Sequence, residues 1–251
     1  MPRFFVDPDQ MDGGHATLAA ADSMHLARSL RARPGETIVV VEAGRIEHGV
    51  LLEEVTPARV SGRVIWSRPA TGEPRLAVHV LQAVPAHAMD ATIEALTEAG
   101  VASIRPVLTA RTVSRPDVSR ASQRTDRWER IACEAAQLAG RAAPPPIHRV
   151  STLREALEEL PAGAAVVVCV SHPDATPILE AARSLSAQVA LVIGPEGGLS
   201  EIDLAVFVEL GAAMVHLGPR TFPSRLAGAV ATSLLLAGAG DLDSAAEPLP
   251  R

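Results

Sequence analysis

The sequence predicts an α/β protein in which a small β-rich domain precedes a larger domain built on a parallel sheet. Residues 1–70 contain short strand-like runs separated by turn signals, which is typical of a small barrel or sandwich. From Leu76 onward, strand-like and helix-like segments alternate, as they do in parallel α/β sheets. The stretch Arg68–Pro74 between these regions holds two prolines and one glycine in seven residues. We therefore predict a first domain over residues 1–70 and a second over residues 71–251.

The first domain is expected to hold a short helix and several strands. A helix over Met24–Leu30 would end before Arg33-Pro34-Gly35, which is a strong turn signal. Ala43-Gly44 marks a hairpin turn between two strand-like runs. The predicted strands are Thr37–Glu42, Ile46–Val55 and Arg59–Trp66.

The second domain is expected to alternate strands with helices. Thr152 and Glu155 form a capping box that predicts the start of one helix. Thr176-Pro177 predicts another helix, with the threonine as N-cap and the proline at the first helical position. The predicted strands are Leu76–Gln82, Ser103–Leu108, Ala165–Val170, Val189–Ile193 and Ala213–Leu217. The predicted helices are Met89–Ala99, Ser122–Gly140, Leu153–Leu160, a helix after Thr176-Pro177, Ser200–Leu210 and Leu226–Ala237. The last of these is apolar almost all round, so it must be buried against the core or a second subunit.

The composition argues against a disordered protein and against a general nucleic-acid binder. Hydrophobic residues form 47% of the chain, which indicates a folded globular protein. The formal net charge of −6 does not indicate a general nucleic-acid binder, and all 23 basic residues are arginine. The densest run of arginines, from Arg105 to Arg149, is either a solvated helix face or a local phosphate-binding surface.

Cysteines, histidines and apolar runs give no sign of a metal or a membrane. Cys133 and Cys169 form no CxxC pair and are interpreted as buried structural thiols. The histidines are scattered, without an HExxH pair. No apolar run approaches the ~20 residues of a membrane span. We therefore expect a cytoplasmic protein without a metal site.

The stretch Val189–Ser200 is the candidate functional site. Five apolar residues, with the length of a buried parallel strand, run into a turn that holds three glycines, a proline and Glu196. Ser200 suits a helix N-cap, and Glu201 and Asp203 suit the first helical turn. Open α/β sheets bind their ligands at such turns, where glycine lets the backbone approach the ligand closely.

The turn does not match the common ligand-binding motifs. A P-loop needs a lysine, and the chain has none. The turn also lacks the GxGxxG spacing and the GxSxG pattern of a nucleophile elbow.

Two other unusual turns follow apolar strands, at His172-Pro173 and at Leu217–Arg220. Each turn alone is interpreted as a tight turn, and His172 and His216 alone are interpreted as structural histidines rather than ligands. Together, the three loops could enclose a flat adenosyl ligand at one edge of the sheet.

At these residues the chain resembles the ribosomal RNA small subunit methyltransferase E family, which belongs to the SPOUT class of S-adenosylmethionine (SAM) methyltransferases. The strongest match is Ile193–Ser200 followed by Glu201, and Leu217–Arg220 is the second. Weaker agreements are Arg3-Phe4-Phe5, His25-Leu26 with Arg28, Glu98 with Gly100-Val101, Pro106 with Arg111, and Gly140-Arg141. The resemblance implies a PUA-like β-barrel over residues 1–70 that helps to hold RNA. It also implies a SPOUT α/β domain with a trefoil knot over residues 71–251, and a homodimer through that domain.

The implied reaction is methyl transfer from SAM to N3 of a uridine in small-subunit (16S) ribosomal RNA. N3 lies on the Watson–Crick edge, so the base must be unpaired or splayed out. The resemblance implies that SAM is held by His172, Ile193, Gly194, Pro195, Glu196, Gly198, Leu217 and Gly218. Arg220 and Arg141 are the implied catalytic residues, since arginine suits a developing anion. RNA is expected to contact Arg3, Arg28, Arg111 and Arg225, and Arg141 is also expected to face it.

The chain departs from the family pattern after Arg220. The family usually continues with Leu-Arg-Thr-Glu-Thr-Ala, whereas this chain has Phe222–Ala227, so that Pro223 and Arg225 replace an arginine and a glutamate. Ala95 replaces a common lysine, and Leu138 replaces a glutamine. Besides a divergent enzyme, these losses are compatible with a paralogue that has another RNA target, or with a non-catalytic SAM- or RNA-binding protein of ribosome assembly. A Rossmann-like enzyme that uses a nicotinamide cofactor is a more distant alternative.

Overall fold

The computed structural model describes residues 1–112, 121–172, 174–185, 187–243, 245 and 248–250. Contacts divide the chain into two compact units. The first unit comprises Met1–Glu73, Ala136–Pro144 and the described residues of Ala246–Arg251. The second unit comprises Pro74–Ala135 and the described residues of Pro145–Ala245.

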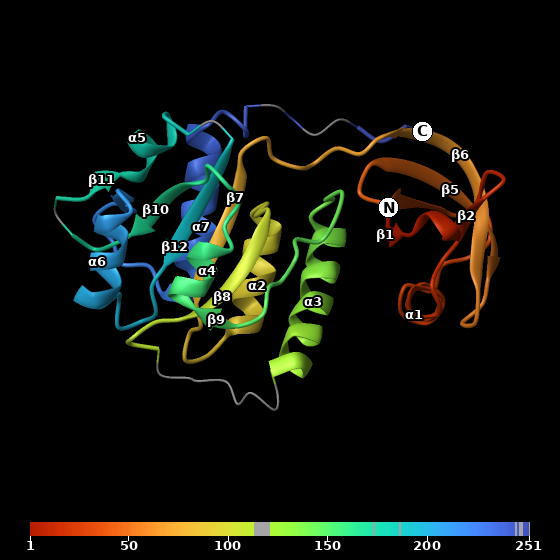
Figure 1. The fold of residues 1–251 in the computed structure, drawn as a ribbon. Coiled ribbons are helices and arrows are strands. Elements are labelled where there is room, and N and C mark those ends of the chain that lie inside the picture. Colours follow the sequence, from red (N-terminus) through yellow and green to blue (C-terminus); the bar gives the residue numbers. More distant parts are fainter. Residues whose placement is uncertain (113–120, 173, 186, 244, 246–247, 251) are drawn as a thin grey trace. The chain divides into compact units, whose positions relative to one another are not determined.

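The first unit is built on a curled six-stranded sheet (Figure 1). Its strand order is β1-β4-β5-β6-β3-β2, in which β1 pairs with β4 in parallel and the other pairs are antiparallel. The strands are β1 (Arg3–Val6), β2 (Met11–Asp12), β3 (His15–Thr17), β4 (Thr37–Glu42), β5 (Ile46–Val55) and β6 (Val60–Pro69). The short helices are η1 (Pro8–Gln10), α1 (Ala20–Met24) and the π-helical η2 (His25–Ser29). The three predicted strands are confirmed, and the predicted helix is the second half of a longer helical segment.

The turn and the bend of this sheet follow from local sequence. Ala43 and Gly44 both have positive φ, 47° and 66°, as the tight hairpin between β4 and β5 requires. A β-bulge lies where the pairing shifts from Gly49–Trp66 to Val50–Val64, and such bulges bend a strand. A Cβ at Gly49 would lie 2.1 Å from Trp66 Nε1, so only glycine lets the indole cross β5 here. The curled sheet encloses a core that contains Phe4, Leu26, Ile38, Val40, Leu52 and Val60.

The second unit contains a seven-stranded sheet in which all the described pairs are parallel, as predicted. The strand order is β11-β13-β10-β12-β7-β8-β9. The strands are β7 (Ala77–Ala83), β8 (Ser103–Leu108), β9 (Ser151–Thr152), β10 (Ala165–Cys169), β11 (Thr176–Pro177), β12 (Gln188–Ile193) and β13 (Ala213–His216). β12 lies between β7 and β10, at the centre of the sheet.

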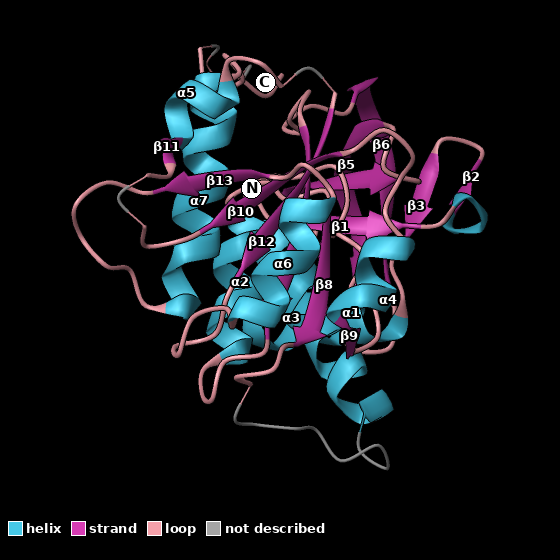
Figure 2. Cartoon of the chain, turned by 60° about the vertical axis from the view of Figure 1, so that its left-hand side comes forward, coloured by secondary structure: helices cyan, strands magenta, loops and turns pink. Residues whose placement is uncertain are grey.

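Helices cover both faces of this sheet (Figures 1 and 2). In β12, Val189, Leu191 and Ile193 join a core with α2, α3, α5 and α7, whereas Ala190 and Val192 join a second core with α4 and α6. This alternation follows from the two-residue period of a strand that is buried on both faces. The helices are α2 (Met89–Glu98), α3 (Ala121–Leu138), α4 (Leu153–Glu158), α5 (Ile178–Ala182), α6 (Glu201–Glu209) and α7 (Ser224–Gly238). All six agree with the predicted helices apart from their ends.

The prediction for Thr176-Pro177 was wrong. These residues form β11, which pairs with Val215 and His216 of β13, and α5 begins only at Ile178. The proline is tolerated because β11 is an edge strand of the sheet. The pairing partner lies some forty residues further along the chain, so the local pattern could not indicate it.

The helix α7 was predicted to be buried against the core or a second subunit, and in the structure one of its sides is buried against the core. It packs against α2, α5, β7 and β12. A Cβ at Gly228 would lie 2.9 Å from Leu96 Cδ2, so this glycine lets α7 approach α2 closely. Leu226 on the other side is 38% exposed. None of the described helices combines the length and the hydropathy that a transmembrane helix needs.

Candidate functional site

Three strands of the second unit end side by side. Cys169 at the end of β10 pairs with Ile193 of β12 and with Val215 of β13. The loops that follow these strands line a cavity of about 810 Å³. This volume lies in the usual range for small-molecule sites. The lining residues are Cys169–His172, Ile193–Glu196, Gly198, Leu199, Leu204, His216–Ser224 and Ala227.

The glycine turn forms one wall of this cavity. The Gly198 N–H donates to the Pro195 carbonyl oxygen over 2.8 Å, and Gly198 has a φ of 72°, which favours glycine. A Cβ at Gly194 would lie 3.2 Å from Leu199 Cγ and 3.3 Å from the Leu199 nitrogen. The turn is therefore folded closely on itself. Arg111 supports it from outside, because Arg111 Nη1 donates to the Gly197 carbonyl oxygen over 2.8 Å.

The helix after the turn begins as predicted. The Ser200 hydroxyl oxygen accepts a hydrogen bond from the Asp203 N–H over 3.2 Å, and the Asp203 carboxylate accepts one from the Ser200 N–H over 3.0 Å. This reciprocal capping box satisfies backbone donors at the start of α6. It fixes where the turn ends and the helix begins.

Ser224 connects the turn to α7. Its hydroxyl donates to the Gly194 carbonyl oxygen over 2.8 Å and accepts from Gln82 Nε2 over 3.1 Å. Ser224 is 5% exposed and Gln82 is fully buried. Ser224 was not predicted from the sequence as a site residue, although a hydroxyl also stands at this place in the family pattern. That shared hydroxyl was the available signal.

Two histidines of the cavity are each held by a backbone N–H. His216 Nδ1 accepts from the Gly218 N–H over 3.0 Å. His172 Nδ1 accepts from the Asp174 N–H over 3.2 Å. In both cases the donor lies two residues after the histidine. Among the described residues, the Nε2 atoms of these rings have no hydrogen-bond partner.

The remaining walls combine apolar groups with a few charges. Burial raises the pKa of the Cys169 thiol to about 12, so this cysteine is a neutral part of the wall and not a nucleophile. Glu196 is exposed, and one of its oxygens accepts from the Ala86 N–H over 3.4 Å. Arg220 is exposed on the opposite loop. The described residues contain no group of three or more side chains that could hold a metal ion.

The cavity brings together nine of the predicted site residues. All eight residues predicted to hold the cofactor line it, and so does Arg220. Arg225 is exposed in the first turn of α7, and Arg111 is exposed beside the glycine turn. Arg28 is exposed in the first unit. The RNA contacts predicted for these arginines stay predictions.

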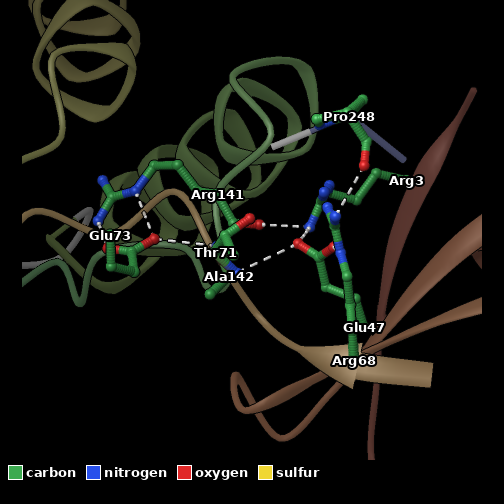
Figure 3. Close-up of polar contacts among 8 residues, drawn as sticks. All are labelled: Arg3, Glu47, Arg68, Thr71, Glu73, Arg141, Ala142 and Pro248. Carbon is green, nitrogen blue, oxygen red and sulfur yellow. Dashed lines mark hydrogen bonds and ion pairs between the residues drawn. The ribbon is translucent and has the colours of Figure 1, made fainter. Parts of the chain in front are cut away.

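Arg3 and Arg141 lie together in the first unit, in a cluster of ion pairs (Figure 3). Arg141 Nη2 donates to the Glu73 carboxylate over 2.6 Å, and Arg141 is 3% exposed. Arg3 Nη1 donates to Glu47 over 2.9 Å and to the Arg141 carbonyl oxygen over 3.2 Å. Both guanidinium groups thus have carboxylate partners within the unit.

Glu47 is the centre of this cluster. Its side chain is fully buried, and Arg68 Nε also donates to it, over 2.9 Å. Burial raises the pKa of Glu47, but hydrogen bonds from Arg3 and Arg68 outweigh it, so that the pKa lies below its ordinary value. The Thr71 N–H donates to the same carboxylate over 3.4 Å. The cluster ties the segments around residues 3, 47, 68–73 and 141 to one another.

The residues that depart from the family pattern have varied surroundings. Pro223 lines the cavity as the residue before α7, where an absent N–H costs nothing. Ala95 is partly buried on α2. Leu138 is 83% exposed at the end of α3.

The chain is similar in sequence to known proteins over most of its length. A family model described as an RNA methyltransferase domain matches residues 72–236. Ribosomal RNA small subunit methyltransferase E from Mycobacterium bovis is 34% identical over 237 residues, which cover 91% of this chain and 88% of that protein. The protein of the same name from Bacillus subtilis is 24% identical, with 94% of this chain and 96% of that protein covered.

Solved structures share the fold over nearly the whole chain. Ribosomal RNA small subunit methyltransferase E from Neisseria gonorrhoeae, bound to S-adenosyl methionine, has a TM-score of 0.85 and 27% identity. The match covers 94% of this chain and 97% of that one. A putative methyltransferase from Legionella pneumophila in complex with SAM has a TM-score of 0.81 and 24% identity, with 94% and 96% covered.

Proposed function

Because this chain belongs to the ribosomal RNA small subunit methyltransferase E family, we propose that it methylates N3 of a uridine in 16S ribosomal RNA, with SAM as the methyl donor. One observation carries the proposal. A single cavity of about 810 Å³ unites the eight residues predicted to hold SAM with the cationic Arg220. The relative from Neisseria gonorrhoeae, which shares the fold, binds SAM.

The residues of the cavity fit an adenosyl ligand. Ile193, Leu199 and Leu217 supply apolar walls for a flat ring, and the glycines leave backbone groups accessible to it. Glu196 adds a negative charge that suits the sulfonium of SAM. When bound, SAM supplies a methyl group on a positively charged sulfur. The protein's part is to bind, to orient and to stabilise charge.

Arg220 is the proposed catalytic residue. When the uridine N3 proton passes to water, a negative charge is left on the base, and a guanidinium beside the base stabilises that charge. Arginine stays protonated in proteins, so Arg220 cannot itself accept the proton. Among the described residues Arg220 has no ion-pair partner, so its N–H groups are available to the substrate.

The other arginines are assigned by their surroundings. Arg28, Arg111 and Arg225 are exposed, and we assign them to phosphate contacts, which help position the RNA. Arg111 also supports the glycine turn through Gly197. Arg3 pairs with the buried Glu47, and Arg141 pairs with Glu73, whose side chain is 39% exposed, so we assign both arginines to holding the first unit together. The catalytic role predicted for Arg141 stays a prediction. If Arg3 or Arg141 contributes to RNA binding, we expect it to do so by holding the first unit in its folded form.

Family membership also supports a finer description of the fold. We propose that the curled sheet of the first unit is a PUA-like RNA-binding domain, and that the second unit contains a trefoil knot and forms a homodimer. The exposed Leu226 on α7 provides apolar surface for such an interface. Light scattering of the purified protein should give the mass of a dimer, about twice 26.2 kDa. Since ribosomes are the substrate, the proposed site of action is the cytoplasm.

The activity is tested with purified protein, labelled SAM and small ribosomal subunits from a strain that lacks the gene. Wild-type protein should transfer label to the RNA. Arg220→Ala should slow the transfer by about 100-fold or more, as expected for a lost electrostatic contact to a transition state. Arg154→Ala serves as a matched control, because Arg154 is exposed on α4 and does not line the cavity. Equal rates for both variants would contradict the role of Arg220.

A non-catalytic SAM- and RNA-binding protein of ribosome assembly is the second candidate. The observation that favours it is the replacement of an arginine and a glutamate by Pro223 and Arg225 next to the cavity. This candidate predicts that the protein binds SAM and small-subunit RNA but transfers no label. Turnover on any RNA excludes it.

A further inference from the structure

His216 presents a hydrogen-bond donor whose position is fixed. It is the last residue of β13, and its backbone pairs with Pro177 of β11. Its Nδ1 accepts from the Gly218 N–H over 3.0 Å. A backbone N–H can only donate, so Nδ1 carries no proton. In a neutral imidazole the proton therefore resides on Nε2.

This Nε2–H is available to a ligand. His216 lines the cavity and is only partly buried. Among the described residues, none accepts a hydrogen bond from its Nε2. The hydroxyl of Ser224, also in the cavity wall, already donates to the Gly194 carbonyl oxygen. His216 therefore supplies a donor that the protein itself does not use.

The second histidine of the cavity has the same arrangement. His172 Nδ1 accepts from the Asp174 N–H over 3.2 Å, which favours the proton on Nε2, but the Asp174 carboxylate also lies 3.7 Å from Nδ1. His172 follows β10 and His216 ends β13, and these strands are neighbours in the sheet. Of the two, His216 lies on the strand itself and has the more firmly fixed Nε2–H. His172 is exposed, whereas His216 is more enclosed.

We propose that His216 is a cofactor-binding residue that donates its Nε2–H to an acceptor atom of the adenosyl ligand. This inference rests on the proposed function, because it takes the cavity to be the SAM site. The acceptor belongs either to the adenosine part or to the carboxylate of the ligand. Because the donor is already held in place, little conformational entropy is lost when it bonds to the ligand, so the hydrogen bond contributes to both affinity and specificity.

Two substitutions separate this role from a purely structural one. His216→Asn keeps an oxygen where Nδ1 stands, so it can still accept from Gly218, but it lacks the Nε2–H. His216→Gln can place an amide donor near the Nε2 position, but it loses the acceptor for Gly218. Ligand donation predicts that Asn weakens SAM binding more than Gln does. A structural role predicts the reverse.

Isothermal titration calorimetry with SAM and with methylthioadenosine, which lacks the amino-acid part, provides the measurement. We expect His216→Asn to weaken SAM binding by about three- to tenfold, the typical worth of one hydrogen bond. His216→Gln should weaken it by less than this. Equal losses with both ligands place the acceptor in the adenosine part, and a loss with SAM alone places it on the carboxylate. If His216→Asn binds both ligands like wild type, the proposal is wrong.

Further readouts keep the result independent of activity and of folding. Long-range ¹H–¹⁵N spectra should show His216 as the Nε2–H tautomer, and the Nε2 resonance should shift when SAM is added. Absence of that shift would contradict the proposal. His15→Asn, an exposed histidine of the first unit, is the control and should leave affinity unchanged. If the wild-type protein does not bind SAM at all, the proposed function fails rather than the role of His216.

Discussion

The Ser224 hydroxyl donates a hydrogen bond to the Gly194 carbonyl oxygen over 2.8 Å, which joins the first residue of α7 to the glycine turn. The same hydroxyl oxygen accepts from Gln82 Nε2 of β7 over 3.1 Å. One buried side chain thus connects three segments that lie far apart in the sequence. This hydrogen bond holds the glycine turn in position. Because Ser224 also lies in the wall of the cavity, losing the bond would change the shape of the cavity.

Replacing Ser224 by alanine should therefore weaken both folding and cofactor binding. The Gly194 carbonyl loses its partner inside the protein, which we expect to lower the free energy of unfolding by about 1–3 kcal/mol. SAM affinity should fall several-fold, measured by calorimetric titration. Ser224→Thr retains the hydroxyl and should stay close to wild type. Ser233→Ala removes an exposed hydroxyl from the same helix and should change neither quantity. Unchanged affinity in Ser224→Ala would contradict this account of the turn.

Alanine substitutions at Gly198 and at Gly211 separate the effect of backbone strain on stability from an effect on SAM binding. Gly198 and Gly211 both have positive φ, 72° and 65°, and an added Cβ would have nothing within 4 Å at either position. Alanine at either site should lower the free energy of unfolding by about 1 kcal/mol through strain alone. Only Gly198→Ala should also weaken SAM binding, since Gly211 does not line the cavity. Similar affinities for the two variants would argue against a role of this turn in the site.

Substitution of Glu47, the carboxylate partner of Arg3, tests the structural role assigned to Arg3. Glu47→Gln leaves Arg3 and Arg68 in the cluster without their buried anion, and we expect it to lower the free energy of unfolding by about 3 kcal/mol. Glu53 lies on the same strand and its side chain is 50% exposed, so Glu53→Gln should cost less than about 1 kcal/mol. Urea unfolding monitored by circular dichroism compares the two. Equal midpoints would contradict the importance of the cluster.

Two partly buried histidines predict how stability depends on pH. Burial lowers the pKa of His79 and of His148, and the nearby Arg105 guanidinium lowers both further. Below the ordinary value of 6.5, the unfolded chain therefore binds more protons at these sites than the folded chain does. Stability must then fall as the pH decreases from about 7.5 to about 5.5. His148→Gln should reduce this slope in urea unfolding measured at several pH values. A slope unaffected by the substitution would show that other groups dominate.

The sequence predicted those elements whose signals are local. The Ser200 capping box marked the start of α6, and the pair Ala43-Gly44 marked the hairpin between β4 and β5. Residues of β12 are apolar on both faces, which identified a central strand of the parallel sheet. The positions of the three strand ends followed from the alternation of strands and helices. These features therefore required no knowledge of distant contacts.

Features that depend on distant partners were missed. Thr176-Pro177 has the pattern of a helix start, but pairing with Val215 and His216 makes it an edge strand. The bond from Ser224 to Gly194 spans thirty residues and leaves no periodic trace in the sequence. The carboxylate partners of Arg3 and Arg141 could not be identified either, because the sequence shows an arginine but not its partner.

Mass spectrometry of nucleosides from 16S ribosomal RNA tests the central claim most directly. Cells with the gene, cells without it, and cells that carry only the Arg220→Ala variant are compared. We predict an N3-methyluridine that is present with the gene, absent without it, and not restored by the variant. The same methylated uridine at full level in cells that lack the gene would contradict the proposed function.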